Sequence, residues 1–207
     1  MKRLTKPLMT LMAVMCLSAP AFAAAPVVGE PAPDFSATDI NGAAVKLSDM
    51  KDKIVVLEWN NPECPFVIKH YDTQNMQGLQ AELTAKDVVW VSINSGAEGQ
   101  QGFLTPETAK TTLDEKGSKP SHYVLDTDGS IGKLYDAKTT PHMFVVGKDG
   151  VLAYAGAIDN DPTPRHEGVK TATNYVRAAV EALIEGKPVE VASSQPYGCG
   201  VKYGTNQ

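Results

Sequence analysis

The stretch that decides the fold is LEWNNPECPFVIKHY, residues 57–71. Its first three residues end a nearly unbroken apolar run, residues 54–59, which is typical of a strand covered on both faces of a parallel sheet. A short polar loop follows, and Pro65 suits the first position of a helix, where the N–H that proline lacks is not needed. The sequence therefore places Cys64 at or next to the N-cap of a helix.

Strands and helices alternate around this stretch. Apolar residues keep close to helical spacing from Pro65 to Leu83, apart from a wider step between Tyr71 and Met76, and a second apolar strand follows at 88–93. Strand, helix and strand make a βαβ unit, which predicts an α/β domain. The other predicted elements are a hairpin of 35–40 and 44–47, a helix from 105 toward 113, a strand at 122–126, a hairpin of 143–146 and 151–155, and a helix over 171–185 that Gly186 ends.

The N-terminus has the three parts of a secretory signal peptide, residues 1–23. A basic start precedes a short apolar stretch at residues 8–17 and an Ala-x-Ala ending, which predicts cleavage after Ala23. Because the apolar stretch is too short to span a bilayer, we expect no membrane insertion after cleavage. The sequence thus predicts a periplasmic protein made of one domain, residues 24–207.

Charge and cysteine content narrow the class of protein. Removal of the first 23 of 207 residues leaves 184, enough for one full core, with 16 basic and 24 acidic side chains. The formal charge of −8 that results argues against nucleic acid and anionic membranes as partners. Cys16 leaves with the signal peptide, so Cys64 and Cys199 remain, the latter in a tail that begins at about residue 187. In an oxidising compartment this pair forms either a structural disulfide or a redox couple.

The N-cap position has consequences for the Cys64 thiol. Free amide groups and the positive end of the helix dipole stabilise a thiolate there, so the pKa of the thiol is expected to fall. Lys69 and His70 are expected to add to this effect, and Glu63 to oppose it. The alternative is a buried cysteine that packs as an inert small hydrophobe, which the polar loop before the helix makes the weaker hypothesis.

The order of apolar strand, aromatic residue, short loop, Cys-Pro and helix resembles the thioredoxin superfamily. In this resemblance Cys64 matches the attacking cysteine of the Cys-x-x-Cys motif, while Val67 stands where that family has its resolving cysteine. Thr140-Pro141 resembles the loop in which thioredoxins place a cis-proline opposite the attacking cysteine, so a cis bond is expected here. Residues expected to shape the site are Trp59, Asn61, Pro65, Thr140 and Pro141.

A closer resemblance is to bacterial redoxin proteins of the AhpC/TSA family, also called peroxiredoxin-like. Its marks are residues 61–67 (NPECPFV), 140–144 (TPHMF), 154–159 (YAGAID) and 198–203 (GCGVKY). The resemblance implies a thioredoxin-like α/β fold, in which helices flank a central mixed β-sheet and an N-terminal β extension precedes it.

Three functions remain open on the sequence alone. The first is a periplasmic thiol-disulfide oxidoreductase in which Cys64 attacks a disulfide and Cys199 acts as the resolving cysteine. The second is a thiol peroxidase, in which peroxide oxidises Cys64 to a sulfenic acid that condenses with Cys199. Peroxiredoxins resemble one another in a Thr or Ser, a Pro and an Arg around the cysteine, and here those positions hold Asn61, Leu57 and Pro141.

The third function is a non-enzymatic binding domain stapled by a Cys64–Cys199 disulfide, which is worth about 4–5 kcal/mol in the chain-entropy model. The expected partners are protein or small-molecule thiols and disulfides, and peroxides under the second hypothesis. No cofactor is expected.

No metal site is expected either. His70 follows Cys64 by six residues, whereas residues on one helix face are three or four apart. His122, His142 and His166 are interpreted as surface or loop residues, and the acidic residues at 126, 128, 159 and 161 as turn residues.

Overall fold

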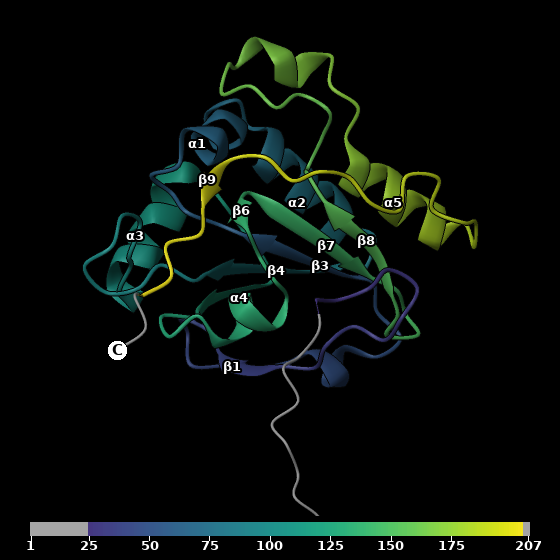
Figure 1. The fold of residues 1–207 in the computed structure, drawn as a ribbon, viewed down its shortest axis with the longest axis horizontal. Helices are drawn as coiled ribbons and strands as arrows, with labels where there is room; N and C mark the ends of the chain where they lie inside the picture. The colour runs from purple at the N-terminus through teal and green to yellow at the C-terminus, as the bar shows by residue number, and fades with distance from the viewer. Residues whose placement is uncertain (1–24, 205–207) are drawn as a thin grey trace, which may run out of the picture.

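A five-stranded mixed sheet runs through the centre of the computed structural model, which describes residues 25–204 (Figure 1). Its strands are β3 (Val55–Trp59), β4 (Val89–Asn94), β5 (His122–Leu125), β7 (His142–Val146) and β8 (Leu152–Gly156). In the order β5-β4-β3-β7-β8, the first three strands are parallel, β7 pairs antiparallel with β3, and β8 pairs antiparallel with β7. All five lie where the apolar runs predict strands, and β3 is buried along its whole length because both its faces are covered.

Helices and a hairpin cover the two faces of the sheet. On one face lie α1 (Pro65–Asp72), α2 (Asn75–Thr84) and α5 (Tyr175–Ile184), and on the other lie α4 (Ser130–Leu134) and the hairpin of β1 (Ser36–Thr38) and β2 (Ala44–Lys46) (Figure 1). The remaining helices are α3 (Pro106–Lys116), η1 (Leu47–Met50) and η2 (Glu167–Lys170). This arrangement confirms the predicted α/β class, the mixed sheet and the N-terminal β extension.

Each face of the sheet has its own hydrophobic cluster. One cluster packs Val56, Met76, Leu79 and Val180 between the sheet and helices α1, α2 and α5, and it includes Cys64. The other packs buried residues from β3 and β7 against the hairpin and α4, and its aromatic members are Phe35, Trp59, Tyr135 and Phe144. Successive residues of β3 alternate between the two clusters, as the two-residue period of a strand requires.

The helix predicted from Pro65 to Leu83 is two helices. α1 ends at Asp72, and Gln74 adopts a left-handed backbone with φ 60° before α2 begins at Asn75. The amide of Thr73 donates to the Lys69 carbonyl and the amide of Gln74 to the Tyr71 carbonyl, which closes the last turn of α1. The wider step between Tyr71 and Met76 in the sequence falls at this break.

Other differences from the sequence prediction concern short elements. α4 has five residues and no apolar period of its own, and it begins where the Asp126 carboxylate accepts hydrogen bonds from the amides of Ile131 and Gly132. Two-residue strands β6 (Thr139–Thr140) and β9 (Cys199–Gly200) also lack a sequence pattern. The last helix, predicted from residue 171, begins at Tyr175, because the Asn174 side chain caps it.

The predicted signal peptide lies in residues 1–24, outside the described residues. In the stretch from 25 to 204, none of the helices combines the length and the apolar character that crossing a bilayer requires.

Candidate active site

Cys64 stands at the N-cap of α1, as the sequence predicts, with Pro65 in the first turn. Its backbone amide donates to the Asn61 carbonyl at 3.0 Å, which closes the tight turn between β3 and α1. The side chain is 0% exposed, and its Sγ donates to the carbonyl oxygen of Thr140 at 3.0 Å. The thiol is therefore held between the start of α1 and the loop before β7.

The C-terminal tail brings the second cysteine to the first. β9 pairs antiparallel with β6, and in this register Cys199 lies opposite Thr140. The Thr140–Pro141 bond is cis, as expected from the resemblance. The two thiols lie close enough for each to shift the pKa of the other, and both cysteines are free. Residues 135 positions apart thus meet at one place, because the tail adds a strand beside the loop that faces α1.

The surroundings push the pKa values of the two thiols in opposite directions. Burial works against ionisation of Cys64, but hydrogen bonds from the Cys199 thiol and the Thr140 side chain outweigh it, so the pKa of Cys64 is lowered. Burial raises the pKa of Cys199 to about 11, and its hydrogen bond to Cys64 acts in the same direction. Cys64 is accordingly the thiol that ionises first, and the Cys199 thiol stabilises the Cys64 thiolate as a proton donor.

Lys69 and His70 do not act on the pKa of Cys64 in the way that the sequence predicts. Burial lowers the pKa of His70 to about 3, with the Lys69 charge as a second cause, so the imidazole is neutral. The Lys69 ammonium is fully buried and donates to the backbone oxygen and carboxylate of Asp161, at 2.8 and 3.4 Å. The prediction that both residues stabilise the thiolate as cations is wrong for His70, and the Lys69 charge is paired with Asp161.

Two more residues that were expected to shape the site differ in their roles. Asn61 orders the loop before Cys64, because its Oδ1 accepts from the Glu63 amide at 2.9 Å and its Nδ2 donates to the Gln101 carbonyl at 3.4 Å. Trp59 points away from the thiol and packs in the cluster on the opposite face of the sheet, where its Nε1 donates to Ser95 at 3.1 Å. The expectation that Trp59 borders the site is therefore wrong, because its place in β3 turns it to the other face.

A buried carboxylate next to this loop is not predicted by the sequence. Glu58 is 0% exposed within β3, where the apolar run predicts only packing. Its Oε1 accepts from the Tyr71 hydroxyl at 2.8 Å and from Asn60 at 2.9 Å, and its Oε2 accepts from Ser92 at 2.8 Å and from the Trp90 indole at 2.9 Å. Three of the donors, Tyr71, Trp90 and Ser92, come from α1 and β4, so the carboxylate ties β3 to both elements.

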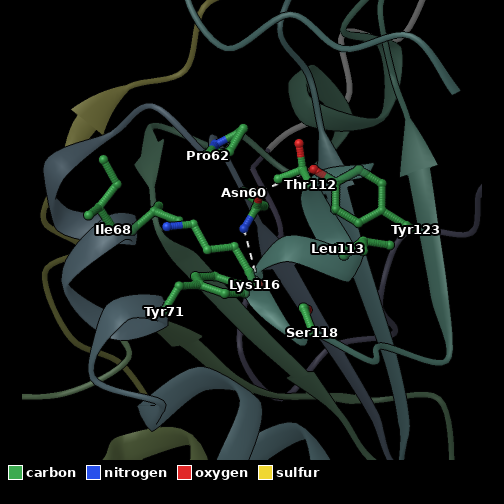
Figure 2. Close-up of a pocket in the computed structure, with 10 residues that line it drawn as sticks. Asn60, Pro62, Ile68, Tyr71, Thr112, Leu113, Lys116, Ser118 and Tyr123 are labelled. Carbon is green, nitrogen blue, oxygen red and sulfur yellow. Dashed lines mark hydrogen bonds between the residues drawn. The ribbon is translucent and has the colours of Figure 1, made fainter. Parts of the chain in front are cut away.

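A small cavity lies beside the site, between α1 and α3 (Figure 2). Apolar side chains of Ile68 and Leu113 line it, and Lys116 and Tyr123 lie at its border (Figure 2). Its volume of about 20 Å³ suffices for roughly one water molecule. The cavity therefore has no room for an organic substrate.

The histidines are not placed as the sequence interpretation has them, except His166, which is exposed. His142 is buried in β7, and burial lowers its pKa to about 4. His122 lies in β5, and its Nδ1 contacts the Asp39 carboxylate at 2.9 Å. Across residues 25–204, no group of three or more His, Cys, Asp or Glu side chains is arranged to hold a metal ion.

Comparison with known proteins identifies the family. Residues 28–155, more than half of the chain, match the model of the AhpC/TSA family. This chain belongs to the AhpC/TSA family. A curated relative of this AhpC/TSA protein is the thiol-disulfide oxidoreductase ResA of Bacillus subtilis (strain 168), which is 26% identical over 129 residues. That alignment covers 59% of this chain and 63% of ResA, so the chain spans less than two thirds of this relative.

Solved structures show what fold the AhpC/TSA protein shares. A hypothetical protein from Sinorhizobium meliloti 1021 superposes with a TM-score of 0.77 at 25% identity, covering 88% of this chain and 98% of the other. The thioredoxin domain of a thiol-disulfide oxidoreductase from Bacteroides vulgatus superposes with a TM-score of 0.52 at 18% identity, covering 70% and 96%. The AhpC/TSA protein has a thioredoxin-like fold, which confirms the fold predicted from the resemblance.

Proposed function

We propose that this AhpC/TSA protein is a thiol-disulfide oxidoreductase in which Cys64 is the nucleophile and Cys199 the resolving cysteine. The observation that carries the proposal is the contact between two free thiols whose pKa values are shifted in opposite directions. Exchange needs a thiolate, an accessible sulfur and a second thiol within reach. The lowered pKa of Cys64 favours the thiolate and Cys199 supplies the second thiol, while access to the buried Cys64 sulfur requires the tail to move. The 26% identity to ResA, a thiol-disulfide oxidoreductase by name, supports the same chemistry.

The reaction proceeds in two exchanges. The Cys64 thiolate attacks one sulfur of a partner disulfide, so that a mixed disulfide forms and the other partner sulfur leaves as a thiolate that takes up a proton. The Cys199 thiol then loses its proton and attacks the Cys64 Sγ, which releases the second partner sulfur as a thiol. The partner gains two electrons and two protons, the protein ends with a Cys64–Cys199 disulfide, and the reverse sequence oxidises a partner dithiol.

Residues around the pair have supporting roles in this proposal. Thr140 and cis-Pro141 form the loop against which both thiols lie. Asn61 and Pro65 hold the turn that presents Cys64 at the start of α1, where helix amides favour its thiolate. We propose protein or small-molecule thiols and disulfides as partners. The basic and apolar N-terminal sequence supports export to the periplasm as the place of action.

The two other hypotheses have less support. A peroxidase would have to activate peroxide without the usual hydroxyl and guanidinium groups. Leu57 is buried in the core of β3, the Asn61 amide is used in the loop, and Pro141 stands at the arginine position. A purely structural staple does not account for the lowered pKa of one thiol beside the raised pKa of its partner.

The proposal is tested by trapping the intermediate, in a Cys16→Ser background that leaves only the two cysteines of interest. Reduced protein is mixed with oxidised glutathione, and products are followed by intact mass. We expect the parent protein to pass to the internal disulfide, and Cys199→Ala to stop at a stable mixed disulfide between Cys64 and glutathione.

Cys64→Ala is the matched control, because it retains a single cysteine whose partial burial, the largest cause of its raised pKa, does not depend on Cys64. We expect it to react at least tenfold more slowly than Cys199→Ala at pH 7. Equal reaction of the two single-cysteine variants, or a parent protein that never reaches the internal disulfide, would show that the assigned roles are wrong.

A further inference from the structure

The nucleophile is covered by the chain's own tail. After α5 the tail returns across the sheet edge to α1 and reaches β6 as β9, seen in yellow in Figure 1. Cys64 is 0% exposed, its Sγ contacts the Thr140 oxygen, and Tyr197 and Cys199 of the tail pack against the core cluster to which Cys64 belongs. A partner disulfide therefore reaches the Cys64 sulfur only when this segment moves.

Tyr197 fastens the tail two residues before Cys199. Its hydroxyl donates to Asp159 Oδ1, and the Tyr197 hydroxyl oxygen lies 3.1 Å from Nε2 of His70. Because the hydroxyl proton is given to Asp159, His70 must donate from Nε2, and its Nδ1 then accepts from the Asn75 amide at 2.9 Å. All of these hydrogen bonds run in one direction and end on the carboxylate, so the Tyr197 hydroxyl is used both as donor and as acceptor.

The Tyr197 ring is held by α1 as well. Its centroid lies 6.0 Å from that of Phe66, and the buried Lys69 ammonium lies 5.1 Å from it. Lys69 is itself fixed by the Asp161 backbone oxygen at 2.8 Å. The ring thus sits between helix α1 and the loop after β8, where a cation over its face contributes attraction.

Gly198 connects the fixed Tyr197 to Cys199 and allows the tail to pass close to the Thr140 loop. The backbone passes so close to the loop that a Cβ at position 198 would lie 2.0 Å from the Thr140 oxygen. Its φ of 135° is also one that residues with a side chain rarely adopt. With Tyr197 fixed and no side chain at 198, the next residue is set opposite Thr140 and its thiol meets Cys64.

We propose that Tyr197 is a positioning residue: its hydroxyl, bound between His70 and Asp159, holds Cys199 against Cys64 and keeps the tail over the nucleophile. Its role in exchange rests on the function proposed above, whereas its effect on the geometry of the two thiols does not. One hydroxyl thereby sets both the ease of internal disulfide formation and the access of a partner to Cys64.

The first test is the equilibrium of the reduced protein with oxidised glutathione, which yields the internal disulfide and two glutathione thiols. We expect Tyr197→Phe to lower this equilibrium constant by about tenfold, which corresponds to a potential about 30 mV less negative for a two-electron couple. Tyr135→Phe is the matched control, because it also loses one hydroxyl hydrogen bond, to Pro33 at 2.7 Å, in the cluster on the other face of the sheet. We expect the control to stay within twofold of the parent.

The second test is the alkylation rate of Cys64 in reduced protein, read by peptide mass with Cys199 replaced by serine in every variant. Tyr197→Phe is expected to raise this rate at least fivefold, and Tyr135→Phe to leave it unchanged. If Tyr197→Phe fails to fold, Gly198→Ala replaces it, since its Cβ displaces the tail by a steric route. Circular dichroism of each reduced variant verifies that the fold is intact.

Unchanged equilibrium and unchanged alkylation in a folded Tyr197→Phe variant would overturn the proposal. Failure of the proposed function gives a different pattern: the two thiols still respond to Tyr197→Phe, but Cys64 forms no mixed disulfide in the Cys199→Ala variant. The two proposals are therefore separable within one set of variants.

Discussion

At the scale of single residues, Cys64 and Cys199 carry the same chemical group in different surroundings. Cys64 is buried at the N-cap of a helix, while Cys199 sits on a two-residue strand of the tail and is partly buried. Burial disfavours the thiolate of both, so the direction of the hydrogen bond between them decides which one ionises. In the mechanism that we propose, the nucleophile and the resolving thiol are thus distinguished by their surroundings rather than by residue type.

This dependence predicts a difference between two substitutions of Cys199. Cys199→Ser keeps a hydroxyl that donates to the Cys64 thiolate, whereas Cys199→Ala removes the donor. We therefore expect a higher Cys64 pKa in the alanine variant than in the serine variant, measured from the pH dependence of thiolate absorbance or alkylation. Identical titration curves would mean that the Cys199 side chain does not stabilise the thiolate.

The buried histidines predict loss of stability in acid. Burial lowers the pKa of His142 to about 4 in the folded protein, against about 6.5 when unfolded, so the unfolded chain binds the extra proton between these values. Stability then rises with pH across this window and falls as the pH drops from about 6.5 toward 4. One such histidine changes the free energy of unfolding by up to about 1.4 kcal/mol per pH unit within this window.

Urea unfolding at several pH values measures this effect. His142→Gln is expected to flatten the slope of the unfolding free energy between pH 4 and 6.5, because glutamine does not take up the proton. His166→Gln, at an exposed position, is the control and should keep the parent slope. An unchanged slope in His142→Gln would count against a neutral, buried imidazole.

At the scale of elements, the sequence predicts the strands and helices that have an apolar period or a recognisable capping residue. The five sheet strands follow from apolar runs, and α3 follows from Thr105 and Pro106, which form the predicted cap and first turn. The break at Gln74 was visible only as a wide step in the spacing, because a left-handed residue other than glycine leaves no compositional signal. α4 and β9 were missed because they depend on partners far away in the chain, Asp126 and Thr140.

The cap of α5 gives a prediction at this scale. The Asn174 side-chain oxygen accepts from the Arg177 amide at 2.8 Å, while its Nδ2 has no partner among the described residues. Asn174→Ala should lower the unfolding free energy by about 1 kcal/mol through loss of the cap. Asn174→Ser keeps an acceptor oxygen and should retain most of the stability in chemical denaturation. Equal loss in both variants would contradict a capping role.

At the scale of the whole molecule, the site joins three distant parts of the chain: the start of α1, the loop at Thr140 and the tail at Cys199. The resemblance to thioredoxins pointed to Cys64 and Pro141, and the cysteine count pointed to Cys199. Tyr197, His70 and the carboxylates near them could not be grouped from sequence. Their hydrogen bonds form only after the tail has folded back over α1.

The tail also explains how a protein with Val67 at the second motif position can retain a pair of thiols. Val67 packs in the core cluster, 1% exposed, and its side chain has no group that could resolve a mixed disulfide. The second thiol arrives instead from β9, on a segment held by backbone pairing and by the Tyr197 hydroxyl. In the function that we propose, the resolving thiol thus comes from the C-terminal tail, whereas the Cys-x-x-Cys motif places both sulfurs on one helix.

The most direct test of the central claim is the reduction potential of the Cys64–Cys199 pair, obtained by titrating purified protein against thiol buffers and labelling both thiols at each point. An exchange protein should form this disulfide with a potential between about −120 and −270 mV, the range of known thiol-disulfide exchange proteins. A potential below about −300 mV would indicate a structural staple, and the absence of any Cys64–Cys199 disulfide would contradict the resolving role of Cys199.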